Sequence, residues 1–506
     1  YIKGLMGEAR LVTANARVQV ATIVAILSGT LVFSILFEIL LARAGMQDNF
    51  SNTGVIKVVA PLGWLLILST GIELMMAYRL PDVSCKSRKP VSFQWADYFK
   101  GQKLKNQLSW IHRQPLILYS ILGLSVFWGL SQMILAAFPA YDKQILHENN
   151  TALIQGMLAC SGLGIFTGSL LISRLSRRTL NHPLAEWQLR MQMIPFGALG
   201  VTLCLSVLPF LESKLVIALC FLGVGFFGAY FIVPLNAIIQ SRAHPDEVGT
   251  VLAGNNWVQN ISMLGFLGLT IASALYGFGS IWLFYFIIAI CVAGTLSYLR
   301  YGLRDLLQFT LGGLFRMRYR ITPITREEFP AEGGVLLLGN HVSWIDWALI
   351  QLMVPRPIRF VIDRSFYEHW MLYGILKHIR TVAISPRRSK EAIKQIGDAL
   401  RAGDVVCLFP EGHIRYDGEV QEFKSGYALA QRTPEAAVVP FYIHGMRGSR
   451  LSRVKRPRSA PWDFFRGRRR EILVNVGTAM HHPDAQELRG KVEQLRDECL
   501  RAAAEE

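Results

Sequence analysis

The chain has 506 residues, a length that allows several domains. Hydrophobic residues make up 52% of it and charged residues only 18%, which is too apolar for one soluble protein, and the apolar residues are concentrated in the first 300 positions. The net charge of +17 suits nucleic acid or an anionic membrane surface, and an integral membrane chain favours the membrane surface.

The cysteines and the N-terminal residues further limit the kind of protein that the chain can be. Seven cysteines are scattered singly along the chain, and their spacing indicates neither a metal site nor a disulfide framework. The first residues, YIKGLMGEAR, contain no initiator Met and do not form a signal peptide. We therefore expect the chain to begin inside a longer protein.

Eight apolar segments are long enough to cross a bilayer. They lie near residues 18–42, 55–79, 115–140, 151–173, 190–210, 214–236, 250–276 and 279–300. Basic residues crowd the connection after the second segment and follow the fourth, sixth and eighth, as the positive-inside rule requires. Eight spans that start inside bring the chain back inside, so we predict that everything after Arg300 is cytoplasmic.

One long basic loop, Pro81–Arg113, divides two of these spans from the other six. This arrangement resembles the major facilitator superfamily, in which a cytoplasmic loop joins two six-helix halves. Ser169–Arg178, SLLISRLSRR, resembles a basic loop of that superfamily, and Leu11–Leu31 resembles the fifth span of its bacterial lysophospholipid transporters. The resemblance implies that residues 1–300 are a partial transporter domain of the bacterial inner membrane, with the first four spans missing.

Polar side chains within the predicted spans are candidates for a transport cavity, because burying them in lipid is costly. The alternative is hydrogen bonding between helices for the amides and outward snorkelling for the carboxylate. The candidates are Asn255, Asn256, Gln259, Asn260, Gln132 and Glu38. Glycines such as Gly223, Gly225 and Gly228 are expected to serve close helix packing rather than a cofactor site.

Residues 301–330 are predicted to link the membrane part to a second domain. Leu303–Arg320, LRDLLQFTLGGLFRMRYR, is too interrupted by polar residues for a ninth span and ends in basic residues. We predict an interfacial amphipathic helix on the inner leaflet. The alternative is a buried connecting helix.

Residues 331–506 show short strands alternating with amphipathic helices, the pattern of a cytoplasmic α/β domain of ordinary size. The predicted strands are Val335–Gly339, Arg359–Ile362, Thr381–Ser385, Val405–Phe409, Val438–Ile443 and Ile472–Val476. The predicted helices are Trp344–Met353, Phe366–His378, Lys390–Arg401, Ser425–Gln431 and Ala485–Ala503. The predicted fold is therefore a polytopic all-α membrane domain followed by an α/β domain.

The stretch VLLLGNHVSWID, Val335–Asp346, carries the predicted chemistry. Val335–Gly339 is predicted to be a buried strand, and a helix follows with Ser343 as its N-cap. Five residues of straight helix rotate by about 140°, so His341 and Asp346 meet only if the histidine lies on the turn before the helix. A histidine delivered to a carboxylate in this way is an oriented general base.

Four ordered sequence blocks resemble the glycerolipid acyltransferases, the family that contains lysophosphatidic acid acyltransferase. The blocks are Asn340-His341-x-Ser343-x-x-Asp346, Phe409-Pro410-Glu411-Gly412, Phe423-Lys424-Ser425-Gly426 and Val439-Pro440-Phe441-Tyr442-Ile443. The resemblance implies an O-acyltransferase in which His341 is the catalytic base and Asp346 orients it. The substrate-binding residues that it implies are Asn340, Ser343, Glu411, Gly412, Arg415, Lys424 and Arg387.

Two departures from the family pattern bear on the acceptor. The Thr-Arg that follows Glu-Gly in the family is replaced by His413-Ile414, and Arg415 comes one place late. The family block that ends in Ile-Asp-Arg is here Ala383–Arg387. In the family these arginines bind the phosphate of glycerol-phosphate acceptors. Their displacement favours a lysophospholipid with a substituted headgroup, such as 2-acylglycerophosphoethanolamine.

The donor and the partners follow from the same resemblance. An acyl thioester on acyl carrier protein or CoA is already activated, so we expect it as a co-substrate without a further cofactor. Cys407 is a competing nucleophile, but its place in the predicted strand favours a packing role. The basic run Arg447–Arg470 suits anionic inner-leaflet lipid or an acidic carrier protein, with nucleic acid as the weaker alternative.

These observations predict that the chain moves lysophospholipid to the inner leaflet and reacylates its free hydroxyl. One alternative is a lysophosphatidic acid acyltransferase of phosphatidic acid synthesis. Another is a transporter of a different solute with a vestigial acyltransferase domain. Chains of this kind also resemble three-part fusions that end in an acyl-carrier synthetase, so such a domain in a longer chain is a further expectation.

Overall fold

A computed structural model describes residues 10–43, 52–79, 109, 112–145, 151–179, 183–244, 247–324, 329–414, 420, 422–423, 436–447, 449 and 469–505. The chain divides into two compact units, Tyr1–Arg300 and Tyr301–Glu506. One long helix, α11, contributes to both of them. Each unit is described by itself below.

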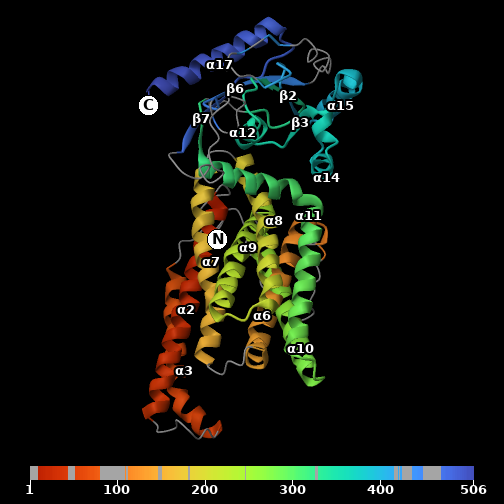
Figure 1. Ribbon diagram of the computed structural model, residues 1–506. Coiled ribbons are helices and arrows are strands. Elements are labelled where there is room, and N and C mark those ends of the chain that lie inside the picture. The colour runs from red at the N-terminus through yellow and green to blue at the C-terminus, as the bar shows by residue number, and fades with distance from the viewer. Residues whose placement is uncertain are drawn as a thin grey trace. The chain divides into compact units, whose positions relative to one another are not determined.

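The first unit is entirely helical where it is described (Figure 1). Its helices are α2 (Leu11–Arg43), α3 (Asn52–Tyr78), α6 (Pro115–Ile145), α7 (Thr151–Thr179), α8 (Pro183–Val207), α9 (Lys214–Arg242), α10 (Val248–Leu275) and the first part of α11 (Ser280–Arg318). A short 3₁₀ turn, η2 (Leu208–Phe210), ends α8. Each of the eight predicted apolar segments falls on one of these helices.

Within the described residues, six helices are long and apolar enough to cross a membrane. They are α6 to α11, and their mean hydropathy ranges from 1.5 to 2.4 over the best window. The described apolar parts of α2 and α3 are shorter, Leu11–Ile26 and Gly63–Tyr78. The prediction of a polytopic all-α membrane domain is therefore confirmed, with six of the eight predicted spans meeting this length and composition.

Glycines allow the helices of the first unit to approach closely. A Cβ added to Gly225 on α9 would lie 1.8 Å from the carbonyl oxygen of Ser161 on α7, and one added to Gly164 would lie 2.0 Å from the carbonyl oxygen of Leu222. Gly197 on α8 similarly faces the backbone of α9. Small residues therefore set the spacing of the α7–α9 and α8–α9 pairs, as is usual for membrane helices. The packing role predicted for Gly225 is confirmed.

The second unit contains a seven-stranded sheet in the order β1-β7-β6-β2-β5-β3-β4. Its strands are β1 (Tyr319–Pro323), β2 (Val335–Gly339), β3 (Ile358–Asp363), β4 (Val382–Ile384), β5 (Val405–Leu408), β6 (Ala437–His444) and β7 (Arg470–Val476). All neighbouring strands run parallel except β6 and β7. The carboxyl ends of β6, β2 and β5 therefore meet at one edge of the sheet.

Helices cover both faces of this sheet (Figure 1). The second unit contains α12 (Asp346–Met353), α13 (Arg364–Tyr367), α14 (Trp370–His378), α15 (Ser389–Arg401) and α17 (Ala485–Glu505), with the 3₁₀ turn η3 (Pro386–Arg388) before α15, and its two cores contain residues of α12, α15 and α17. Alternate side chains of β2 explain the two layers, because successive residues of a strand point to opposite faces. Leu337 packs with α12 and the end of α11, whereas Leu336 and Leu338 pack with α15 and α17.

The predicted elements of this domain agree with the structure, with a few differences. The prediction missed β1, which follows directly from α11 and pairs with β7. The predicted helix Phe366–His378 is divided into α13 and α14, and the predicted helix Ser425–Gln431 lies outside the described residues. Helix α12 begins at Asp346 with Ile345 as its N-cap, so the prediction of Ser343 as N-cap was wrong.

The link between the two domains was predicted to be an interfacial helix, with a buried connecting helix as the alternative. The segment from Tyr301 to Arg318 continues α11 without a break and belongs to the second unit. Phe315 is 6% exposed and packs in the core that α12 and β2 share. Leu314 and Met317, on the other side, are exposed. One face of this segment is therefore a buried connecting helix, and contact of its exposed face with lipid stays a prediction.

Candidate active site

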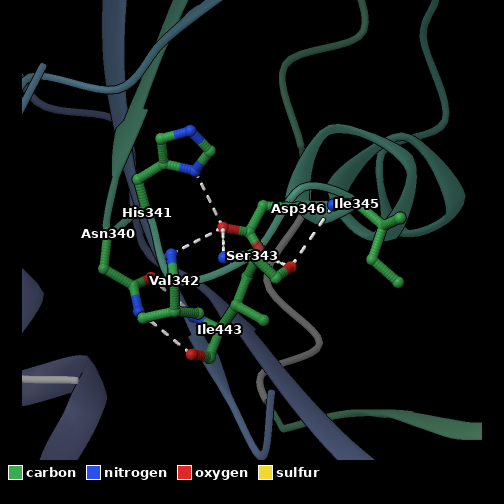
Figure 2. A network of polar contacts seen from close by, with 7 residues as sticks. All are labelled: Asn340, His341, Val342, Ser343, Ile345, Asp346 and Ile443. Atoms are coloured by element: carbon green, nitrogen blue, oxygen red, sulfur yellow. Dashed lines mark hydrogen bonds and ion pairs between the residues drawn. The ribbon is translucent and has the colours of Figure 1, made fainter. Parts of the chain in front are cut away.

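His341 and Asp346 form a hydrogen-bonded pair beyond the carboxyl end of β2 (Figure 2). Strand β2 ends at Gly339 and α12 begins at Asp346, so His341 lies on the turn between them. Its Nδ1 is 2.9 Å from Asp346 Oδ2. The histidine therefore leans back onto the first residue of the helix, as the spacing predicted.

The carboxylate of Asp346 is fully buried and held by four hydrogen bonds (Figure 2). Besides His341, the backbone N–H of Val342 donates to Oδ2 at 2.7 Å and that of Ser343 at 2.9 Å. The Ser343 hydroxyl donates to Oδ1. Because an ionised carboxylate only accepts hydrogen bonds, His341 donates to it from Nδ1–H and presents the lone pair of Nε2.

Asn340 ties the catalytic turn to the neighbouring strand β6. Its side-chain Nδ2 donates to the carbonyl of Ile443 at 3.0 Å, and the N–H of Ile443 donates to its Oδ1 at 2.8 Å. The side chains of Asn340 and Ser343 are 2% and 0% exposed, with their polar atoms engaged inside the protein. The structure therefore gives both residues a positioning role, and their contact with substrate stays a prediction.

The Phe-Pro-Glu-Gly block lies beside His341 because β5 is the other neighbour of β2. The ring of Phe409 stacks on the imidazole, with centroids 4.1 Å apart and planes inclined by 16°. Glu411 is 3% exposed, and Gly412 has a φ of +76°. This left-handed conformation favours glycine at the turn. Three sequence blocks thus converge from β6, β2 and β5.

Cys407 cannot act as the nucleophile in this environment. It lies on β5 beside Leu337 of β2, and its side chain is fully buried. Burial, and secondarily the charge of Asp346, raises the pKa of its thiol well above the usual value. A thiol held in its neutral form is a poor nucleophile. The pairing of His341 with Asp346 is left as the catalytic arrangement.

The predicted phosphate-binding residues do not join this group within the described residues. Arg387 lies in η3 after β4, at the same sheet edge as His341, and is exposed. Strands β5 and β3 separate β4 from β2. Arg415 and Lys424 lie outside the described residues, as does most of the basic run Arg447–Arg470.

The predicted transport residues lie on three helices, α2, α6 and α10. Gln259 donates to Asn255 at 2.8 Å, and Asn260 donates to the carbonyl of Asn256 at 2.8 Å, both one turn apart on α10. Gln132 is half-buried on α6, and the side chain of Glu38 on α2 lies outside the described part of the structure. Within the described residues, the amides of α10 therefore bond along their own helix and not to another helix, which the alternative interpretation expected.

The sequence analysis missed a buried amide pair in the first unit. Asn15 on α2 donates to Gln240 on α9 at 3.2 Å, and Gln240 donates back at 2.8 Å. Both side chains are less than 10% exposed. A reciprocal amide pair is stabilising between helices in a membrane. Its sequence signal is only the polar character of the two residues, because 225 positions separate them.

Comparison with known families matches both units. The Major Facilitator Superfamily model matches residues 2–266, more than half of the chain. The model named Acyltransferase matches residues 320–444, which include His341, Asp346 and the Phe-Pro-Glu-Gly block.

Curated proteins resemble one unit or the other. "Lysophospholipid transporter LplT" of Photorhabdus laumondii is 27% identical over 271 residues, covering 51% of this chain and 58% of that protein. "Probable 1-acyl-sn-glycerol-3-phosphate acyltransferase" of Mycoplasma pneumoniae is 28% identical, covering 31% of this chain and 61% of that protein. "Lyso-ornithine lipid O-acyltransferase" of Rhizobium meliloti is 29% identical, covering 25% of this chain and 47% of that protein.

The chain thus spans about half the length of the curated relatives that it matches. The two kinds of relative divide between the two units, as the two family models do. This chain belongs to the Major Facilitator Superfamily and carries an acyltransferase domain after its membrane helices.

Proposed function

We propose that the chain brings lysophospholipid to the inner leaflet and that its second unit reacylates the free glycerol hydroxyl from an acyl thioester. The observation that carries the enzymatic half is the His341–Asp346 pair, with Phe409 stacked on the imidazole. The transport half is supported by the similarity of the first unit to lysophospholipid transporters. The second unit faces the cytoplasm in this proposal.

The geometry supports a direct transfer without a covalent acyl-enzyme. His341 Nε2 takes the proton of the acceptor hydroxyl as its oxygen attacks the thioester carbonyl. Asp346 accepts from Nδ1–H and stabilises the imidazolium that forms. The tetrahedral intermediate collapses with cleavage of the carbon–sulfur bond, and the leaving thiolate takes the proton from the imidazolium. The donor is CoA or acyl carrier protein in its acylated form.

The acceptor is proposed to carry a substituted headgroup, as 2-acylglycerophosphoethanolamine does. Arg387, at the place of a phosphate-binding arginine, is separated from β2 by two strands. A free phosphomonoester acceptor needs a cation close to the reacting hydroxyl, because two of its oxygens are charged. A relative named for lyso-ornithine lipid supports an acceptor other than 1-acylglycerol-3-phosphate, whereas a relative named for 1-acylglycerol-3-phosphate supports the alternative.

The deciding experiment offers the purified chain lysophosphatidylethanolamine and lysophosphatidic acid together, with a labelled acyl thioester. We expect the label to appear in phosphatidylethanolamine, and the ratio of kcat/KM values to favour that acceptor at least tenfold. Running the assay with acyl-CoA and with acyl carrier protein identifies the donor. A preference for lysophosphatidic acid would replace this proposal with ordinary phosphatidic acid synthesis.

A further inference from the structure

A cavity of about 370 Å³ in the second unit is lined on one side by cations. Arg359 of β3, Lys377 of α14 and Arg380 after α14 all line it, together with Thr381 and Asp398. Three cationic side chains around one cavity form a site for an anion with several oxygen acceptors.

The charges in this cavity are only partly neutralised. Arg359 pairs with Asp404 at 2.6 Å, and Arg401 pairs with Asp398. Among the described residues, Lys377 and Arg380 make no ion pair. Lys377 instead lies 5.6 Å from the ring centroid of Tyr373. Two cations are therefore available to a ligand.

One further feature of the cavity indicates a ligand. Thr381 is 8% exposed, and its hydroxyl has no hydrogen-bond partner in the described part of the chain. A buried hydroxyl without a partner costs free energy, which a ligand oxygen would recover. The φ of +59° at Arg380 belongs to the C-terminal cap of α14, because the N–H groups of Arg380 and Thr381 donate to the carbonyls of Lys377 and Leu376.

Beside the cavity, α14 has an apolar surface that no described part of the protein covers. None of its residues is buried. Trp370 is 82% exposed and Met371 61%. The other exposed apolar residues of the helix are Leu372, Tyr373 and Ile375. Exposed Trp and Tyr next to Lys and Arg are typical of a helix at the membrane–water interface.

We propose that this cavity binds the phosphate of an anionic membrane phospholipid while α14 inserts its apolar side chains among the acyl chains. The bilayer is the partner at hand, because the second unit follows directly from the membrane helices along α11. A soluble phosphate would satisfy the cations but would leave the α14 surface uncovered. The adjoining apolar surface therefore favours the lipid.

This lipid site is separate from the catalytic histidine. Arg359 is in register with Val406, which is in register with Leu336, five residues before His341. His341 lies beyond the carboxyl end of β2, and β5 separates β2 from β3. The inference therefore stands independently of the proposed acyl transfer.

The experiment uses the full chain in phosphatidylcholine nanodiscs with or without phosphatidylglycerol. A fluorophore on Met371→Cys reports insertion through quenching by brominated acyl chains, and the unmodified chain gives the background from native cysteines. The same label on Leu500→Cys, an exposed position on α17, is the control for position. We expect quenching at 371 to depend on phosphatidylglycerol, and the label at 500 to stay unquenched.

Variants then test the cavity itself. Lys377→Gln and Arg380→Asn should each raise the phosphatidylglycerol fraction needed for half-maximal quenching about fivefold. Asn tolerates the left-handed conformation at 380, so this variant should fold. Removing the same charge on α17, with Lys491→Gln and Arg501→Gln, should change nothing. Thr381→Val should weaken lipid binding without lowering thermal stability, because its hydroxyl has no partner to lose in the described structure.

Several results would overturn the inference. If quenching needed no anionic lipid, or if the α17 charge variants reduced it equally, a phosphate site in this cavity would be excluded. If inorganic phosphate bound to the cavity and no lipid quenched the label, the cavity would be assigned to a soluble phosphate ligand. If no brominated lipid quenched the label at 371, α14 would not enter the bilayer.

Discussion

At the scale of single residues, the site depends on one fully buried carboxylate. Asp346 accepts hydrogen bonds from the His341 ring, from two backbone N–H groups and from the Ser343 hydroxyl. This arrangement fixes the imidazole tautomer and supplies the counter-charge for the imidazolium. The ring of Phe409 stacks on one face of the imidazole and restricts its rotation. The catalytic function proposed for His341 thus depends on the neighbours that orient its ring.

Replacing Asp346 with Asn tests this dependence. Asn keeps the size of the side chain but presents an N–H₂ group where the carboxylate accepts, so the imidazole loses its favoured tautomer. We expect acyl transfer to fall by about 100-fold or more, mainly in kcat. Measuring kcat and KM over a pH series separates this loss from weaker binding. Cys407→Ala is the matched control and should retain activity; an inactive Cys407→Ala beside an active Asp346→Asn would reverse the assignment.

At the scale of elements, glycines decide how closely the membrane helices pack. The backbone of α7 occupies the space that a side chain at Gly225 of α9 would need. The corresponding space beside Gly268 of α10 is open, with no atom within 4 Å of an added Cβ. Gly225 therefore leaves no room for a side chain, whereas Gly268 does.

Gly225→Ala and Gly268→Ala make a direct comparison. The first should force α7 and α9 apart and lower the thermal unfolding midpoint of the chain in detergent. The cost is expected to be about 1–3 kcal/mol, as for other overpacking substitutions. Gly268→Ala should be neutral or slightly stabilising, because Ala is the better helix former. Equal midpoints for the two variants would show that the α7–α9 contact is not as close as described.

At the scale of the whole molecule, the chain joins membrane helices to an acyltransferase domain. The first unit has the membrane helices of the Major Facilitator Superfamily, and the second is an acyltransferase domain. If both act on lysophospholipid, the product of transport is the acceptor for acyl transfer. The fusion then holds the acyltransferase at the membrane where its acceptor arrives.

The coupling can be tested with His341→Ala in proteoliposomes that contain an acyl thioester inside. The variant should still take up labelled lysophospholipid, because the substitution lies in the second unit, but should form no diacyl product. The unmodified chain should convert the label to phospholipid. Uptake and acylation are measured separately by extraction and lipid chromatography. If His341→Ala left the diacyl product unchanged, His341 would not be the base, and if the unmodified chain formed no diacyl product, the acyltransferase domain would be vestigial.

The two-domain organisation and the His341–Asp346 pair could both be predicted from local features of the sequence. Long apolar runs predict membrane helices because length and hydropathy are local properties. Short buried strands such as β2 are visible for the same reason, and the spacing of His341 and Asp346 across one turn is also local. The position of Arg387 could only be partly predicted: its shift in sequence was visible, but its distance from β2 follows from the strand order.

Only the tertiary structure decided which distant residues meet. The Asn340–Ile443 bonds join positions 103 residues apart, and the Asn15–Gln240 pair joins positions 225 residues apart. Phe409 reaches His341 because β5 pairs with β2, which no local pattern specifies. The cationic cavity likewise requires β3, α14 and the segment before β4 to fold together. Local chemistry names the residues, whereas packing between distant segments determines their contacts.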